Sequence, residues 1–221
     1  MLNVIYEDNH LLVVEKPVNI LSQGDNTNDD DMVNLLKKYL KEKYNKPGNV
    51  FVGLVHRLDR PVGGIMVFAK TSKAASRLSE QVRNKTFKKT YKAVLHGEMK
   101  KKQDNLSDYL YKDKKTNMVS VVNKNHKDAK DAKLSYKTLA SNNGFSLVEI
   151  DLQTGRPHQI RVQFSSRNHP LHGDQRYGKN VNKKGQQIAL WSYKIEIEHP
   201  TKKEKMEFVC EPPNKYPWNM F

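Results

Sequence analysis

The chain has 221 residues, and its 39 Lys and Arg against 24 Asp and Glu give a formal net charge of +15 at pH 7. An excess of this size creates a positive field that attracts polyanions, so we expect a nucleic-acid partner. The single cysteine, Cys210, excludes an intramolecular disulfide and a multi-cysteine zinc site, and no segment has the ~20 consecutive apolar residues of a membrane-spanning helix.

The N-terminal part of the chain predicts a β-hairpin followed by a helix. Residues 4–6 and 11–15 are rich in β-branched and apolar side chains and are separated by polar residues, which is typical of two paired strands. Residues 24–31 are polar and acidic, and they predict a flexible loop whose last aspartates cap a helix over residues 32–44. Lys16 has two interpretations, a contact to substrate phosphate or a solvated lysine in a turn.

A first candidate site lies in residues 56–70, which read HRLDRPVGGIMVFAK. Apolar runs on both sides of a Pro- and Gly-containing segment predict two strands and a connecting loop that carries Asp59. Arg57 and Arg60 flank Asp59 and favour its ionised form. From these residues alone, Asp59 is either a loop carboxylate neutralised by arginines or a reactive group.

A second candidate site lies on a basic strand that follows a helix predicted over residues 71–83. The strand covers residues 87–97 and places Tyr91 among Lys88, Lys89 and Lys92. An aromatic face can stack on a base that has left its own stack, which is worth roughly 1–3 kcal/mol. The alternative is a tyrosine that fills an amphipathic strand.

A third candidate site follows a predicted hairpin. Residues 100–133 are polar and lysine-rich and predict the least ordered part of the chain, whereas Asn143-Gly144 joins two predicted strands over residues 134–140 and 145–153. Residues 154–162 then read TGRPHQIRV. Thr154 and Pro157 predict the N-terminus of a helix, which attracts anions, with His158 and Arg161 on one face.

These motifs resemble those of the RluA-type pseudouridine synthases. The matching patterns are H-R-L-D at residues 56–59 with a following apolar strand and A-K, K-x-Y-x-A-x-x-x-G at residues 89–97, and T-G-R-x-H-Q-I-R at residues 154–161. They occur in the order typical of the family, within a resemblance that covers about residues 3–213. Two departures stand out: Val62-Gly63 replaces a Thr-Ser pair beside Asp59, and Asn19 replaces a glycine, which is consistent with a positive φ.

The resemblance implies a fold and a reaction. The expected fold is the α+β pseudouridine synthase fold, a mixed and largely antiparallel sheet with flanking helices and a central active-site cleft. Residues 1–221 are expected to form a single catalytic domain without an N-terminal RNA-binding domain. The implied reaction is the isomerisation of specific uridines in structured RNA, ribosomal or transfer, with no cofactor and no metal.

The resemblance also implies roles for individual residues. Asp59 is the catalytic carboxylate, which attacks the nucleotide or removes a proton from the sugar. Tyr91 packs against the target base, and Arg161 pairs with Asp59. Arg57 fills the space that the flipped nucleotide leaves in the RNA; a phosphate contact or a bond to Asp59 are its alternatives. Further RNA contacts are expected from Arg60, Lys89, Arg156 and His158.

Two other function classes fit parts of the sequence. A nucleoside or glycosyl hydrolase would use a pair of carboxylates, whereas only Asp59 stands out here. A catalytically silent RNA-binding protein of the same fold would fit the loss of hydroxyls at Val62-Gly63, although Asp59, Tyr91 and Arg161 are all retained. We expect a cytoplasmic monomer with no obligatory protein partner and no membrane association.

Overall fold

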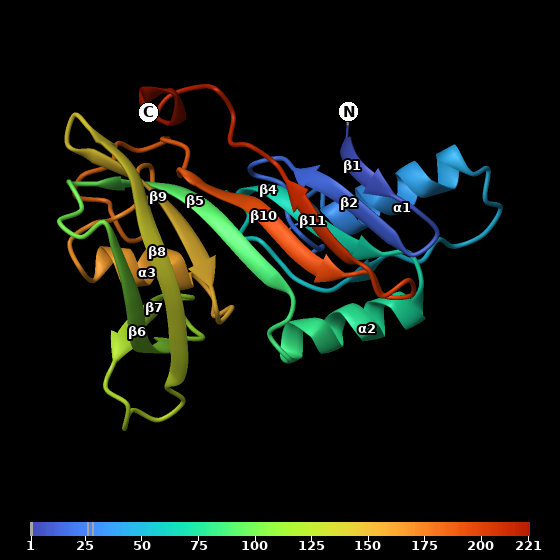
Figure 1. Cartoon of the computed structure of the whole chain (residues 1–221), viewed down its shortest axis with the longest axis horizontal. Coiled ribbons are helices and arrows are strands. Elements are labelled where there is room, and N and C mark those ends of the chain that lie inside the picture. Colours follow the sequence, from blue (N-terminus) through green and yellow to red (C-terminus); the bar gives the residue numbers. More distant parts are fainter. Residues whose placement is uncertain (1, 26, 28) are drawn as a thin grey trace. The chain divides into compact units, whose positions relative to one another are not determined.

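The computed structural model describes residues 2–25, 27 and 29–221. It divides into two compact units (Figure 1). Unit 1 consists of Met1–Lys88 and Ser192–Glu211, and unit 2 consists of Lys89–Trp191 and Pro212–Phe221. Both units combine antiparallel strands with helices, so the predicted α+β class is confirmed.

Unit 1 is built on strands that are far apart in the sequence. Its strand order is β1-β2-β4-β10, with β3 paired to β4 and β11 paired to β10. The β1–β2, β2–β4 and β10–β11 pairs are antiparallel, which confirms the predicted N-terminal hairpin. The strands are β1 (Asn3–Glu7), β2 (Leu11–Lys16), β3 (Gly53–Leu54), β4 (Gly63–Ala69), β10 (Leu190–Glu198) and β11 (Lys205–Val209).

Strand β4 is the buried centre of this arrangement. All seven of its residues are buried, as expected for a near-continuous apolar run covered on both faces. Gly64 has a φ of +112°, and a Cβ added there would lie 2.3 Å from the backbone oxygen of Ser192. Only glycine allows this close approach of two backbones, so the strand that follows the first motif is fixed at its start.

The two helices of unit 1 begin at caps that the sequence predicts. Helix α1 (Met32–Lys43) is capped by Asp31, which accepts from the Asn34 backbone N–H, and α2 (Ser72–Arg83) is capped in the same way by Thr71. Both predicted helices are therefore confirmed, with α1 one residue shorter. The predicted flexible loop over residues 24–31 includes residues 26 and 28, which lie outside the described residues.

Unit 2 is an antiparallel sheet covered by a short helix. Its strand order is β5-β9-β8-β6-β7, and α3 (Gln159–Ser165) places Val162 against Leu110, Val119 and Ala132 in one buried cluster. A short 3₁₀ helix, η1, occupies Trp218–Met220. The strands are β5 (Lys88–His96), β6 (Gln103–Lys112), β7 (Val119–Val122), β8 (Lys130–Asn142) and β9 (Phe145–Leu152).

The turn between β8 and β9 confirms one prediction, and the strands before it overturn another. Asn143 and Gly144 both have positive φ, 50° and 75°, as a tight hairpin turn requires. Residues 100–133, predicted to be the least ordered, instead contain β6, β7 and the start of β8. Leu106 and Leu110 on β6 are buried, whereas the other residues of the strand are exposed or half-buried. Its polar composition is therefore that of a strand with one face packed and the other facing solvent.

A buried carboxylate ties β1 to α1 and to the end of β4. Glu7 accepts hydrogen bonds from Lys43 (2.7 Å) and Tyr39 (2.9 Å) on one oxygen, and from Lys70 (2.7 Å) and Tyr44 (2.7 Å) on the other. Burial alone would raise the pKa of Glu7, but these four donors lower it to about 2. The cluster therefore stabilises unit 1 while Glu7 is ionised.

We expect Glu7→Gln to lower the free energy of unfolding by roughly 1–3 kcal/mol near neutral pH, since hydrogen bonds to a charged group are lost and water screens part of the ion pairs. A carboxylate with a lowered pKa stabilises the fold above its unfolded value of 4.5, and that contribution disappears as the pH falls towards 2. The difference between wild type and variant should shrink over that window in denaturant titrations.

The control for this experiment is Glu42→Gln. Glu42 is exposed and lies 4.0 Å from Lys38, a surface pair of small energetic value. A difference between wild type and Glu7→Gln that does not change between neutral and acidic pH would contradict the assignment.

Candidate functional site

The loop that carries Asp59 connects β3 to β4 and is tightly turned. The Val62 backbone N–H donates to the Asp59 carbonyl at 2.9 Å. Leu58 and Val62 are buried, Asp59 is half-buried, and Arg57 and Arg60 are exposed. Its apolar side chains therefore pack into unit 1, while its arginines face solvent. This agrees with the prediction of a loop held between two strands.

Lys16 has a different role from both sequence interpretations. Its side chain is fully buried, and its Nζ donates to the carbonyls of Pro17 (2.9 Å), Ile20 (2.6 Å) and Arg60 (3.1 Å). Burial lowers the pKa of Lys16 to about 7, against the opposing effect of the Asp59 charge. Neither a solvated lysine nor a phosphate contact fits a side chain that solvent does not reach.

The cations beside Asp59 are arranged at the surface of unit 1. Arg60 forms an exposed ion pair with Asp29 at 2.7 Å, and its Nε donates to the Asn19 carbonyl at 3.2 Å. Asn19 has a φ of +67°, which confirms the expectation for the residue that replaces a glycine. Arg57 is exposed and is suited to contact an anionic ligand.

In unit 2, Tyr91 and Lys89 lie on β5. Tyr91 is 6% exposed and pairs with Ile150 of β9. Lys89 is half-buried, and burial lowers the pKa of its ammonium group. Its Nζ lies close to Gly155 of the third motif, 3.3 Å from where a Cβ would be, so the second and third motifs meet within unit 2.

The third motif begins its helix later than predicted. Helix α3 starts at Gln159, preceded by His158 at a φ of +52° with no side-chain cap. The Gln159 side chain accepts from the Thr154 hydroxyl (2.8 Å) and from the Arg156 backbone N–H (3.1 Å). These bonds hold residues 154–158 as a loop, so the predicted anion-attracting helix start at Pro157 is wrong.

His158 and Arg161 do not share a helical face as predicted, but they contact the same side chain. His158 Nδ1 lies 2.7 Å from the Tyr177 hydroxyl, and the Arg161 guanidinium lies over the Tyr177 ring at 5.2 Å from its centroid. The Nε of Arg156 donates to the Asp131 carbonyl at 2.8 Å. The third motif is thus held against β8 and the segment around Tyr177.

Arg161 forms a buried, bidentate ion pair with Asp174, which the sequence did not predict. Its Nε and Nη2 each donate to one oxygen of Asp174 at 2.8 Å, and the two residues are 7% and 1% exposed. Burial would raise the pKa of Asp174, but the bonds from Arg161 and from the backbone amides of Arg176 and Tyr177 lower it. Asp174 lies in the segment HPLHGDQRYG at residues 169–178, outside the three motifs, and its neighbour Gly173 was the only local signal for a turn at this position.

The predicted site residues therefore fall into two groups. Arg57, Asp59 and Arg60 lie in unit 1, and Lys89, Tyr91, Arg156, His158 and Arg161 lie in unit 2. The unit 1 residues share the loop between β3 and β4, and the unit 2 residues lie on β5 and in the third motif, which contact each other. The pairing of Asp59 with Arg161 stays a prediction.

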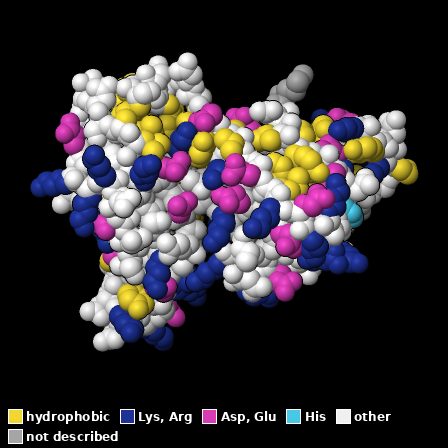
Figure 2. Space-filling model, viewed as in Figure 1, with side chains coloured by type: hydrophobic (Ala, Val, Ile, Leu, Met, Phe, Trp, Pro, Cys, Tyr) yellow, Lys and Arg dark blue, Asp and Glu magenta, His cyan; other side chains and the backbone are white. Residues whose placement is uncertain are grey.

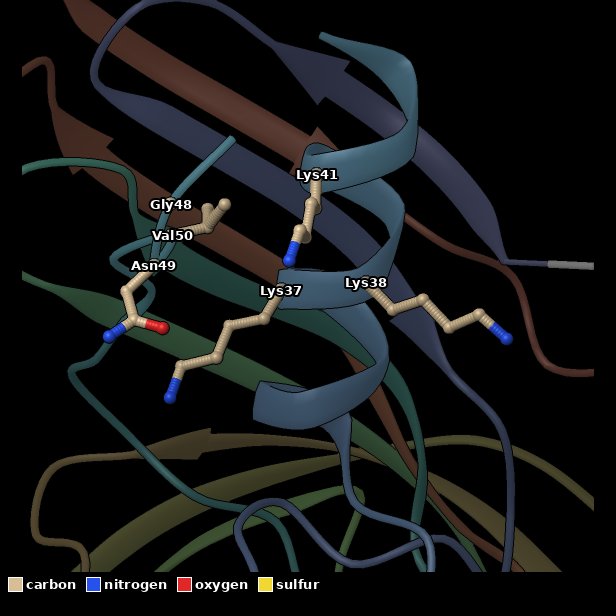
Figure 3. Close-up of a pocket in the computed structure, with 6 residues that line it drawn as sticks. All are labelled: Lys37, Lys38, Lys41, Gly48, Asn49 and Val50. Carbon is tan, nitrogen blue, oxygen red and sulfur yellow. The ribbon is translucent and has the colours of Figure 1, made fainter. Parts of the chain in front are cut away.

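Positive charge is also concentrated outside the motifs. Figure 2 shows Lys and Arg side chains over the visible face of both units, with Asp and Glu between them. A surface pocket of unit 1 is lined by three lysines of α1 and by residues 48–50 (Figure 3). Such lysines suit diffuse contacts to a polyanion.

Two further features concern ligands and membranes. Within residues 2–25, 27 and 29–221, we find no cluster of three or more His, Cys, Asp or Glu side chains that could hold a metal ion. Over the same residues, no helix has the length and apolar character that crossing a membrane requires.

We expect Asp174→Asn to destabilise the protein by about 3–5 kcal/mol, because the variant removes the negative charge from a buried, bidentate ion pair with Arg161. Denaturant unfolding followed by circular dichroism measures this loss. Asp104→Asn is the matched control: Asp104 pairs with Lys101 at the surface, and water screens such a pair, so its loss should matter far less. Equal effects of the two substitutions would contradict a structural role for the buried pair.

Comparison with known proteins gives consistent matches over most of the chain. Residues 10–166 match the family model described as RNA pseudouridylate synthase. The RNA pseudouridine synthase YhcT of Bacillus subtilis is 34% identical over 215 residues, which cover 96% of this chain and 68% of the relative. The ribosomal large subunit pseudouridine synthase D of Borreliella burgdorferi is 32% identical over 96% of this chain and 66% of its own length.

Solved structures show the same fold. The human RNA pseudouridylate synthase domain containing 4 superposes with a TM-score of 0.78 at 21% identity, over 96% of this chain and 88% of that chain. The human domain containing 1 superposes with a TM-score of 0.76 at 23% identity. The family and the fold predicted from the three motifs are both confirmed.

Proposed function

This chain belongs to the RNA pseudouridylate synthase family, and from that premise we propose that it converts specific uridines of ribosomal or transfer RNA to pseudouridine. The reaction breaks the N1–C1′ bond of uridine, turns the uracil while it is bound, and joins C5 to C1′. A relative named as a ribosomal large subunit pseudouridine synthase supports ribosomal RNA as the first substrate to test.

Asp59 starts the reaction in this proposal. Its carboxylate either attacks the nucleotide or removes a proton from the sugar, and both routes need an ionised group at a fixed position. Asp59 lies half-buried on a tightly turned loop, in which its carbonyl accepts from the Val62 backbone N–H. This loop geometry is the observation that carries the proposal.

Arg161 and Tyr91 are proposed to complete the site. The guanidinium of Arg161 suits this role, because its planar N–H donors match the two oxygens of a carboxylate. Its bond to Asp174 fixes its orientation, which suits a residue that must hold Asp59 ionised. Tyr91, on the strand next to the third motif, would pack against the uracil.

Cationic side chains of both units are proposed to bind the RNA. They are Arg57, Arg60, Lys89, Arg156 and His158, and we propose that Arg57 enters the space of the flipped nucleotide. The family match runs through residues of both units, which supports one catalytic domain over residues 1–221. We propose a cytoplasmic monomer that acts without a cofactor or an obligatory protein partner.

A second candidate function rests on one observation. Val62-Gly63 stands where the family has Thr-Ser, so two hydroxyls beside Asp59 are missing. A protein that binds RNA without turnover would tolerate that loss. The next experiment separates the two functions.

We expect the wild-type protein to introduce pseudouridine at defined positions when incubated with RNA from cells that lack it. Asp59→Asn should lower the rate by roughly 10²–10⁴-fold, because the amide neither attacks nor accepts a proton effectively. Pseudouridine mapping of the RNA measures both. Asp128→Asn is the control, since Asp128 is exposed with a φ of +64° that asparagine also accepts. No new pseudouridine with wild type would support the silent RNA-binding protein.

RNA binding should depend steeply on salt and survive the loss of Asp59. Displacement of counterions makes the logarithm of affinity fall linearly with the logarithm of salt concentration. Arg57→Ala should reduce that slope by about one if Arg57 contacts a phosphate. Arg83→Ala, an exposed arginine at the end of α2 outside the three motifs, should leave the slope unchanged. Salt-insensitive binding, measured by filter binding, would contradict an electrostatic interface.

A further inference from the structure

The turn after β2 is hydrogen-bonded to Leu58, the residue that precedes Asp59 in its loop. The Ser22 hydroxyl donates to the Leu58 carbonyl at 2.8 Å and accepts from the Leu58 backbone N–H at 3.0 Å. Ser22 and Leu58 are 5% and 6% exposed. Because one hydroxyl satisfies both backbone groups of Leu58 in a dry environment, this contact fixes the peptide that leads into Asp59.

The same turn is also hydrogen-bonded to Arg60, the residue that follows Asp59. The Arg60 carbonyl accepts from Lys16 Nζ at 3.1 Å and from the Asn19 backbone N–H at 2.8 Å. Pro61 restricts the backbone of Arg60 further. The peptides on both sides of Asp59 are thus bonded to one short segment, residues 16–22.

The segment that does the holding is itself rigid. Lys16 Nζ also donates to Pro17 and Ile20, so the three N–H donors of an ammonium group meet three carbonyl acceptors. The side chain of Lys16 is fully buried at the end of β2, which pairs with β4 from Leu11 to Lys16. Any shift of the turn relative to the sheet would leave these buried polar groups without partners.

We infer that Ser22 and Lys16 are positioning residues for catalysis, which fix the Leu58 and Arg60 peptides and thereby the direction of the Asp59 carboxylate. This inference rests on the proposed role of Asp59. Val62 and Gly63 have no hydroxyl, and the Ser22 hydroxyl that bonds this loop comes from another segment of the chain.

The first test is the rate of pseudouridine formation at saturating enzyme, measured beside the dissociation constant for the same RNA. Ser22→Ala should lower this rate by roughly tenfold to a hundredfold, as expected for a small displacement of a reacting group, while RNA affinity stays unchanged. Ser22→Thr keeps the hydroxyl and should recover most of the rate. Lys16→Met, which fills the same space without donors, should also lower the rate.

Ser146→Ala is the matched control. Ser146 is fully buried in unit 2, and its hydroxyl donates to the Gly97 carbonyl at 3.0 Å and accepts from the Met99 backbone N–H at 3.0 Å. It should lose a similar amount of thermal stability to Ser22→Ala and keep the wild-type rate. A rate that follows thermal stability equally in both alanine variants would overturn the inference.

The failure of this inference differs from the failure of the proposed function. If wild type forms pseudouridine and Asp59→Asn does not, the proposed function stands, and an unchanged rate in Ser22→Ala then overturns the positioning role alone. If Lys16→Met does not fold, Ser22→Ala and Ser22→Thr still decide the question. An inactive wild type would remove both.

Discussion

Charged groups are buried in this protein where directional partners surround them, and the arrangement of its loops depends on that constraint. The ammonium group of Lys16 meets three carbonyls, the carboxylate of Asp174 meets the Arg161 guanidinium and two backbone amides, and Glu7 receives four donors. A buried charge without such partners would cost several kcal/mol. Since the partners come from separate segments, the bonds that make burial tolerable also hold those segments together.

This constraint connects the fold to the proposed chemistry. Asp59 must be ionised and well oriented, yet its loop is short and carries exposed arginines on both sides. The loop gains its order from hydrogen bonds that the Ser22 and Lys16 side chains donate to the Leu58 and Arg60 carbonyls. RNA contacts have the opposite requirement, because they need solvated cations that adapt to a phosphate backbone. The exposed arginines and the lysines of α1 meet that requirement.

Composition was a poor guide where one face of a strand is solvated. Strand β6 carries polar residues at most positions and resembles a flexible linker, but its Leu106 and Leu110 are buried, and Leu110 packs in one cluster with Val119, Ala132 and Val162. Its backbone N–H and C=O groups form hydrogen bonds with β7 on one side and β8 on the other. A strand of this kind is stable only in its sheet, so no local window of the sequence contains the reason for its order.

The sequence by itself determined the features that depend on neighbouring residues. These are the capped starts of α1 and α2, the Asn143-Gly144 turn, the positive φ of Asn19 and the three motifs that identify the family. Tertiary structure decided the burial of Lys16, the partner of Arg161 and the start of α3. In each of these cases the deciding partner comes from a distant part of the sequence. The Arg60 carbonyl accepts from Lys16, Asp174 accepts from Arg161, and the Lys133 carbonyl accepts from the Gln159 side chain at the start of α3. Caps and turns act over a few residues, whereas the partners of a buried charge are known only once the chain has folded.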